Sequence, residues 1–236
     1  MLPILGEFIG TALVITLGTS VVANVVLAET KGQNSGWIVI TLGWAMAVFI
    51  GNYVCVKLGG SGHLNPAFTI GATLFTDFDR SMALPYILAQ FGGAIVGATL
   101  TWLSYYSHFE RTADSYSKLA VFCTAPAIRK TIPNLITEII ATAILVIAAL
   151  GMSQPKTSFV IIGSLPISLV VLAIGLCLGG PTGYAINPAR DLGPRIAHFL
   201  LPIQGKGHSD WSYSWIPVIG PVAGAILGFW GYGLLT

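Results

Sequence analysis

Two identical tripeptides, Asn65-Pro66-Ala67 and Asn187-Pro188-Ala189, interrupt long uncharged stretches of this chain. Asn followed by Pro marks a helix start, because the Asn oxygen caps backbone N–H groups and Pro at the first position lacks the N–H that would need a partner. Two helices are therefore predicted to begin in the middle of apolar sequence. Such re-entrant helices are tolerated at membrane depth only where they are buried in protein or line a cavity.

The composition is that of a membrane protein. Of the 236 residues, 8% are charged and 54% hydrophobic, and the mean hydropathy is +0.80, whereas a soluble domain carries roughly 25% charged residues. A helix that spans the bilayer needs about 20 apolar residues. Uncharged runs that each hold one such helix occur at 8–28, 32–56, 81–109 and 211–236.

Three other uncharged runs require a different interpretation. The run 139–155 becomes a full span if its helix begins near Pro133. The run 157–189 is too long for one helix, and we expect a span near 160–178 followed by a Gly-rich segment. The run 58–76 predicts a Gly-rich segment and a half-helix of about ten residues, too short to cross. The fold class is therefore an all-α membrane protein with six transmembrane helices and two re-entrant half-helices.

The two halves of the sequence resemble each other beyond the tripeptides. Glu7–Ala12 matches Glu138–Ala143, and Gly93–Gly97 matches Gly224–Gly228 at the same offset. Each half contains three spans, and because three is odd the second copy must cross the membrane in the opposite direction. This is an inverted repeat, with its special site expected near the bilayer midplane.

The repeat predicts one channel domain over 1–236, with repeats at approximately 1–110 and 131–236 linked by a loop 107–133, which is extracellular if the N-terminus is cytoplasmic. The basic residues favour the opposite orientation, with the N-terminus outside. If the N-terminus were cytoplasmic, the inner loops would hold three basic residues and the outer loops six, against the positive-inside rule. The three inner residues are Lys57, Arg80 and Lys156.

The half-helices are expected to point their N-termini at each other near the bilayer centre. Each end carries roughly half a positive charge from aligned peptide dipoles, so together they form a barrier to cations and protons. The amides of Asn65 and Asn187 can donate N–H groups to a passing solute. The backbone before each Asn is expected to supply a ladder of carbonyl acceptors, at Ser61, Gly62, His63, Gly183, Ala185 and Ile186.

Donors and acceptors without net charge suit neutral polyols, water or undissociated acids. Arg190 lies about one helical turn after Asn187, so both can face the pore, and a charge at that depth indicates a functional site. A salt bridge between Arg190 and Asp191 is disfavoured because adjacent helix residues do not face each other. We assign Asp191 to helix-start electrostatics and local structure.

Glu7 and Glu138 are the other acidic residues expected within the membrane. A proton relay is one interpretation. Their symmetric positions favour a structural role, in which each carboxylate accepts hydrogen bonds from the N–H groups of an irregular loop. His63 is either a pH gate or a residue of the vestibule, and we favour the second. The glycines of the third and sixth spans are interpreted as surfaces for close helix packing.

Several classes of function are disfavoured. We find no nucleophile–base pair, metal-ligand spacing or phosphate-binding loop in the sequence, so we predict no enzyme, no metal and no cofactor. A net charge of +2 is too small to suggest nucleic acid as a partner. The three cysteines are widely spaced, which favours packing roles over a disulfide framework or a metal site.

The paired Asn-Pro-Ala tripeptides, the six-span inverted repeat and Arg190 together resemble the aquaporin superfamily over essentially the whole chain. Within it, Gly180–Arg195 with its Asp191, and the pair Pro217-Val218, are similar to the glycerol facilitator branch. The resemblance implies a multi-pass protein of the bacterial plasma membrane. It also implies cytoplasmic termini, against the charge count, and a homotetramer in membrane lipid with one pore per subunit.

The resemblance also implies a selectivity filter. Arg190 is its arginine, Gly175 falls where water-selective pores usually place His, and Tyr184 falls where glycerol channels have an aromatic residue that forms an apolar wall. The span-two member is open, because the sequence reads Ser61-Gly62-His63 where the family has Ser-Gly-Ala-His. The candidates are Ile40, Trp44 and Ala45.

The sequence thus predicts a passive channel for glycerol and water that excludes ions and protons. Phe122–Ala127 and Pro194–His198 resemble members associated with lactic acid, which adds undissociated lactic acid, and urea is a further candidate. One alternative is an alternating-access transporter, for which Glu7 and Glu138 would be the only candidates to bind a coupling ion. A strictly water-selective channel and a non-conducting scaffold are the others, and Gly175 argues against strict water selectivity.

Overall fold

The computed structural model describes residues 1–152 and 163–236, and every regular element within these residues is helical. The helices are α1 (Leu2–Val26), α2 (Trp37–Lys57), α3 (Pro66–Phe75), η1 (Arg80–Met82), α4 (Ala83–Ser104), α5 (Tyr106–Arg111), α6 (Ser115–Phe122), α7 (Thr131–Met152), α8 (Leu165–Leu178), α9 (Pro188–Leu200) and α10 (Ile216–Gly233).

Five helical segments are long and apolar enough to cross a membrane, namely α1, α2, η1 with α4, α7 and α10. The sixth predicted span corresponds to α8, of which 14 residues are described. Its expected start near residue 160 lies outside the described residues, as does Lys156. The two predicted half-helices are α3, with 10 residues, and α9, with 13.

The connection between the two halves differs from the predicted loop over 107–133. The chain forms α5 and α6 there, and α6 packs against α1 and α9. Asp114 caps α6, because its carboxylate accepts hydrogen bonds from the backbone N–H groups of Tyr116 (3.2 Å) and Ser117 (2.9 Å). Helices this short carry little periodicity, so the sequence pattern did not reveal them.

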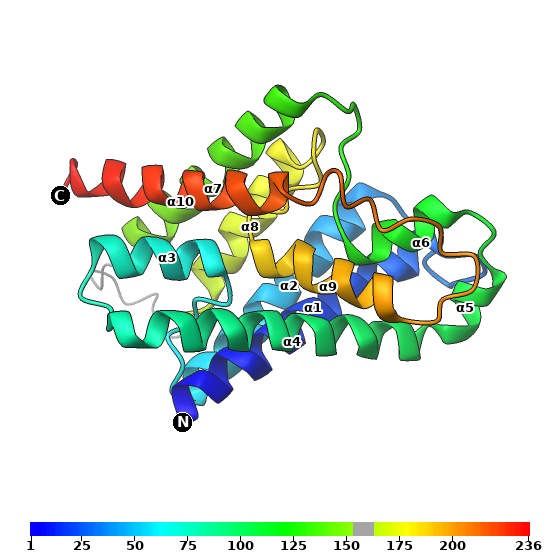
Figure 1. Ribbon diagram of the computed structural model, residues 1–236, viewed down its shortest axis with the longest axis horizontal. Helices are drawn as coiled ribbons and strands as arrows, with labels where there is room; N and C mark the ends of the chain where they lie inside the picture. Colours follow the sequence, from blue (N-terminus) through cyan, green and yellow to red (C-terminus); the bar gives the residue numbers. More distant parts are fainter. Residues whose placement is uncertain (153–162) are drawn as a thin grey trace.

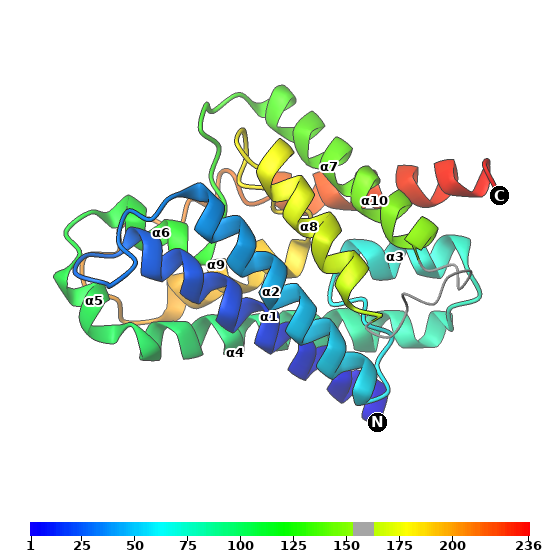
Figure 2. The same ribbon diagram turned by 180° about the vertical axis from the view of Figure 1, so that it is seen from behind.

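The two halves interlock. α1 packs against α2 and α4, and the repeat-related α7 packs against α8 and α10. Each half-helix packs mainly against the last span of the other half, so that α3 lies on α10 and α9 lies on α4 (Figures 1 and 2). Both chain termini lie toward the end of the molecule opposite α5 and α6 (Figures 1 and 2).

Glycines allow the helices of each half to pack closely. A Cβ atom at Gly93 would lie 2.3 Å from the carbonyl oxygen of Phe8, and one at the repeat-related Gly224 would lie 2.4 Å from that of Ile139. Real Cβ atoms do not approach backbone so closely, which confirms the packing interpretation of these glycines. Gly97 and Gly228 make the corresponding approaches in the next turn.

The long helices also carry large apolar side chains on their outer faces. This surface is expected of a protein surrounded by lipid, because the hydrocarbon tails of lipids are as apolar as these side chains. Examples are Leu17, Leu42, Leu88, Ile140 and Leu227, all at least 36% exposed.

Candidate pore at the meeting point of the half-helices

The half-helices α3 and α9 begin at the two tripeptides. The side-chain oxygen of Asn65 accepts a hydrogen bond from Ala67 N at 2.9 Å, and that of Asn187 accepts from Ala189 N at 2.9 Å and Arg190 N at 3.3 Å. The two Asn residues share the same extended backbone, φ −156° and ψ 113°, and Pro follows each. The two predicted helix starts are confirmed.

The side-chain amides of the two Asn residues join the tripeptides across the centre of the molecule. Asn65 Nδ2 donates to the carbonyl of Ile186 at 2.9 Å, and Asn187 Nδ2 donates to that of Leu64 at 2.7 Å. A side-chain amide carries two N–H groups. The sequence predicted that these amides donate to a passing solute, whereas in the structure one N–H group of each holds the opposite loop.

The segments that lead to the two Asn residues contain strained backbone. Leu64, Tyr184 and Ile186 have positive φ angles of 50°, 41° and 46°. This region is unfavourable for a residue with a Cβ atom, above all for a β-branched one such as Ile186. Backbone of this kind persists only where surrounding groups hold it in place.

In the first half, Glu7 supplies that support. Its carboxylate accepts hydrogen bonds from His63 N (3.0 Å) and Leu64 N (2.7 Å), and from Gln90 Nε2 at 2.8 Å. The Cys55 thiol also donates to it, at 3.4 Å. Glu7 is fully buried, so these bonds form in surroundings where a carboxylate needs every partner.

Glu138 does the same in the second half. Its carboxylate accepts from Ala185 N at 3.0 Å and Ile186 N at 2.8 Å, and from the Thr182 hydroxyl at 2.7 Å. The two N–H groups are those of the two residues before Asn187, as His63 and Leu64 are the two before Asn65. The contacts of Glu7 and Glu138 are thus the ones expected from the structural role predicted for them.

Two of the six carbonyls predicted to form the acceptor ladder are already occupied. The carbonyl of Gly62 accepts from Asn52 Nδ2 at 2.8 Å, and that of Ile186 accepts from Asn65. Asn52 in turn accepts from the Ser164 hydroxyl at 2.7 Å, which connects this loop to the start of α8. The other four accept no hydrogen bond within the described part of the chain, and they are the carbonyls of Ser61, His63, Gly183 and Ala185.

Arg190 lies in the first turn of α9. Its guanidinium carbon is 4.0 Å from the centre of the Trp44 ring on α2, and Nη1 donates to the carbonyl of Phe122 at 3.4 Å. Of the three residues left open for the span-two position, Trp44 is therefore in contact with Arg190. Cation–π stacking of this kind fixes the guanidinium plane while leaving its edge free for hydrogen bonds.

Tyr184 packs over α8 beside Gly175. A Cβ atom at Gly175 would lie 2.9 Å from Tyr184 Cζ and 3.0 Å from Thr41 Cγ2. The Trp37 ring meets the Tyr184 ring edge-on, with 5.8 Å between centroids, and its indole N–H donates to the carbonyl of Gly175 at 3.0 Å. The absence of a side chain at Gly175 thus makes room for the Tyr184 phenol.

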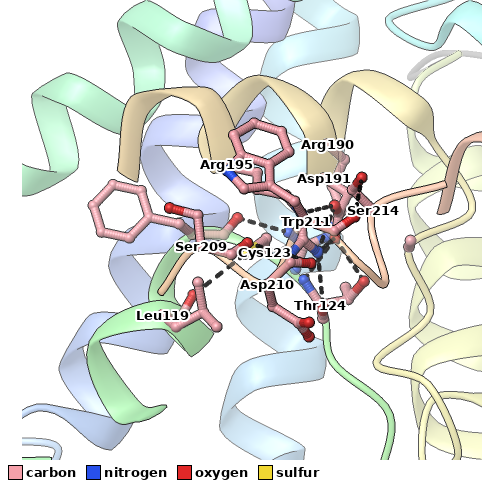
Figure 3. A network of polar contacts seen from close by, with 12 residues as sticks. Leu119, Cys123, Thr124, Arg190, Asp191, Arg195, Ser209, Asp210, Trp211 and Ser214 are labelled. Atoms are coloured by element: carbon pink, nitrogen blue, oxygen red, sulfur yellow. Dashed lines mark hydrogen bonds and ion pairs between the residues drawn. The ribbon is translucent and has the colours of Figure 1, made fainter. Parts of the chain in front are cut away.

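Asp191 pairs with Arg195 one turn further along α9. Its oxygens accept from Arg195 Nε at 2.8 Å and Nη2 at 3.1 Å, and Thr124 N donates to it at 2.7 Å. Figure 3 shows the network around these residues. Arg195 is fully buried and also donates to the carbonyls of Thr124, Ser209 and Asp210. Arg195 is not among the site residues predicted from the sequence, although its spacing of four from Asp191 was the signal.

The His63 side chain lies among aromatic rings. Its ring centroid is 4.8 Å from that of Phe78, 5.2 Å from that of Phe68 and 5.6 Å from that of Tyr86. Its Nδ1 shares a hydrogen bond with the Thr69 hydroxyl at 3.1 Å. The ring is thus held between the re-entrant segment and α4.

Fold and site together define a class of protein, the multi-pass membrane channel with two re-entrant half-helices. The comparisons with known proteins agree. A model of the Major intrinsic protein family matches residues 2–232, and the chain belongs to this family. Members are channels and not enzymes, as predicted from the sequence.

Relatives cover nearly the whole chain. A probable glycerol uptake facilitator protein of Thermotoga maritima is 54% identical over 224 residues, which is 95% of each chain. A D/L-lactic acid transporter of Lactiplantibacillus plantarum is 39% identical and covers 96% of this chain and 94% of its own. Among solved structures, the aquaglyceroporin of Plasmodium falciparum matches with a TM-score of 0.86 and 30% identity, over 98% of this chain and 94% of its own.

Proposed function

We propose that this protein is a passive channel for glycerol and water that excludes ions and protons. The observation that carries the proposal is the junction of the two half-helices. There, Asn65 and Asn187 each keep one amide N–H for a solute, and four carbonyls of the adjoining loops are unoccupied. These donors and acceptors carry no net charge, and two positive helix ends oppose cations at the same point.

The two buried carboxylates support passive flux over coupled transport. An alternating-access transporter needs a site for its coupling ion, usually at an acidic residue. The carboxylates of Glu7 and Glu138 are instead occupied by backbone N–H groups and by Gln90 and Thr182. Neither is left with an oxygen that has no partner.

We assign the solute filter to Arg190, Trp44, Tyr184 and Gly175. Arg190 stacks on Trp44, and Tyr184 fills the space above Gly175. A water-selective pore with His at position 175 would require the Tyr184 ring to move away. The similarity to proteins named as glycerol uptake facilitators supports glycerol as a solute.

Undissociated lactic acid is the second proposed solute. The observation in its favour is the relative named as a D/L-lactic acid transporter, which aligns over 96% of this chain. The acid is neutral when protonated and carries hydroxyl and carbonyl groups that match the same donors and acceptors. Urea has matching groups and is a further candidate.

We also propose one channel domain with repeats at about 1–110 and 131–236, both termini in the cytoplasm, and a homotetramer in the bacterial plasma membrane. The interlocked packing of the half-helices supports the repeats, and family membership supports the assembly. Protease accessibility of terminal tags and the mass of the detergent-solubilised particle test the orientation and the tetramer.

The function is tested by stopped-flow light scattering of proteoliposomes with water, glycerol, urea and lactic acid at two pH values. We expect rapid re-swelling with glycerol at both pH values. We expect lactic acid flux only at the lower pH, because only the protonated acid is neutral. Glycerol permeability equal to that of protein-free vesicles would contradict the proposal.

A further inference from the structure

Two polar atoms in the filter have no hydrogen-bond partner. Six buried side-chain N and O atoms lack a partner in the described part of the chain, and two of them are the Tyr184 hydroxyl and the Trp44 indole nitrogen. Tyr184 is 4% exposed and Trp44 is 3% exposed. A buried polar atom without a hydrogen bond is unfavourable, and a bound water or ligand is one way to supply the missing partner.

The geometry brings the side chains of Tyr184 and Trp44 to the same face of α2. Tyr184 Cζ and Thr41 Cγ2 both lie about 3 Å from the point where Gly175 would carry a Cβ atom, 2.9 Å and 3.0 Å respectively. The phenol tip of Tyr184 therefore reaches the α2 face that carries Thr41. Trp44 lies three residues after Thr41, which places it on that same face of the helix.

Arg190 closes this group of polar side chains. Its guanidinium stacks on the Trp44 ring, and the single hydrogen bond of the guanidinium among the described residues, to the carbonyl of Phe122, is long at 3.4 Å. Donors on Arg190 and Trp44, and a donor–acceptor on Tyr184, are thus gathered along one face of α2. A purely apolar wall opposite Arg190, as the resemblance implies for Tyr184, does not describe this arrangement.

We propose that the Tyr184 hydroxyl and the Trp44 N–H are specificity-determining groups that hydrogen-bond the permeating solute. They favour solutes with an oxygen on each carbon, such as glycerol and other short polyols, over analogues that lack one. This inference rests on the proposed function and specifies which solutes the channel selects. A site built to bond a solute hydroxyl leaves its own buried groups unpaired when the hydroxyl is missing, and so rejects the analogue.

The test compares glycerol with 1,2-propanediol, which lacks one hydroxyl. In proteoliposomes, Tyr184→Phe removes the hydroxyl and keeps the ring, and it removes an unpaired buried atom, so the variant is expected to fold. We expect its ratio of glycerol to propanediol permeability to fall by about three- to tenfold, the range for one neutral hydrogen bond. Trp44→Phe, which keeps a ring beneath Arg190, is expected to lower the same ratio.

Tyr213→Phe is the matched control. The Tyr213 hydroxyl is also buried without a partner, but its ring lies under Arg129, whose guanidinium carbon is 5.4 Å from the ring centre. We expect its permeability ratio to equal that of the unmodified protein.

Three results would overturn the inference while the unmodified protein conducts glycerol. The first is a ratio of glycerol to propanediol permeability that is unchanged in both Tyr184→Phe and Trp44→Phe. The second is a proportional rise of the glycerol and propanediol fluxes, which would indicate a wider pore alone. The third is a fall of the ratio in Tyr213→Phe equal to that in the filter variants. If the unmodified protein conducts no glycerol, the proposed function fails instead.

Discussion

The segment that leads to Asn65 and the segment that leads to Asn187 are held in the same way. In each, a buried carboxylate from the first span of that half accepts two consecutive backbone N–H groups, and the Asn amide donates to the opposite loop. The helix starts have identical backbone angles. Symmetry is therefore retained in the groups that fix the half-helices.

The surroundings of the two segments differ. The first is flanked by His63 in its aromatic surroundings and by Asn52 on the carbonyl of Gly62. The second carries Tyr184 and is followed on α9 by Arg190 and by the buried Asp191–Arg195 pair, which bonds the backbone of Thr124 in the linker. From this comparison we expect exclusion of ions to depend on the shared part, and the choice of solute to depend on the second segment and the side chains packed against it.

The largest expected effect tests the shared part. Glu7→Gln and Glu138→Gln each place an amide N–H against a backbone N–H and remove charge-assisted bonds, at a cost of roughly 3–5 kcal/mol. We expect both variants to lose thermal stability in detergent to a similar extent, whereas the exposed Glu29→Gln should not. A large loss in one variant alone would mean that the two carboxylates are not equivalent.

The Asp191–Arg195 pair tests the asymmetric part. Arg195→Met leaves the fully buried Asp191 carboxylate without its cation, which costs about 3–5 kcal/mol when a buried pair is broken. We expect Asp191→Leu in the same chain to recover part of that loss, because no unpaired charge is then buried. Thermal unfolding of the single and double variants measures the difference, and a double variant no more stable than Arg195→Met would argue against the pair.

Gly175→His tests whether the choice of solute depends on the surroundings of Tyr184 in the second segment. Even the Cβ atom of the new residue would lie 2.9 Å from Tyr184 Cζ, and overpacking of this kind costs about 1–3 kcal/mol. We expect glycerol flux to fall at least about tenfold, and water flux by less, because water is smaller. Gly180→Ala, whose Cβ would meet nothing within 4 Å, is the control. Equal loss of both fluxes would remove Gly175 from the filter.

The smallest effect is expected outside both segments. Hydrogen bonds from the Ser117 side chain and backbone hold the pKa of Asp114, the cap of α6, below its usual range. A carboxyl group with a depressed pKa in the folded protein stabilises the fold at pH values above its unfolded-state pKa, which is near 3.9. That stabilisation is lost as the pH falls through the folded-state pKa. Asp114→Ala should therefore cost at most about 1 kcal/mol, unchanged between pH 5 and 8. A pH-dependent cost in that window of a thermal unfolding series would be inconsistent with this account.

Local chemistry made much of this fold predictable. The Asn-Pro pairs give the helix starts, the uncharged runs give the long helices, and the glycines of α4 and α10 give close packing. The short helices α5 and α6 were missed, since helices of six and eight residues have no clear period.

The site was less predictable, because its contacts join distant segments. Counting along the sequence left Ile40, Trp44 and Ala45 open, whereas the structure places Trp44 beneath Arg190. The occupied carbonyls of Gly62 and Ile186 depend on Asn side chains from other elements. No local pattern encodes such partners.

The most direct test of the central claim records glycerol flux and internal pH in the same proteoliposomes. The account predicts that the initial flux rises in proportion to the glycerol gradient, is unaffected by an imposed pH gradient, and leaves the internal pH constant. Saturable flux driven by the pH gradient, or proton movement that accompanies glycerol, would contradict it.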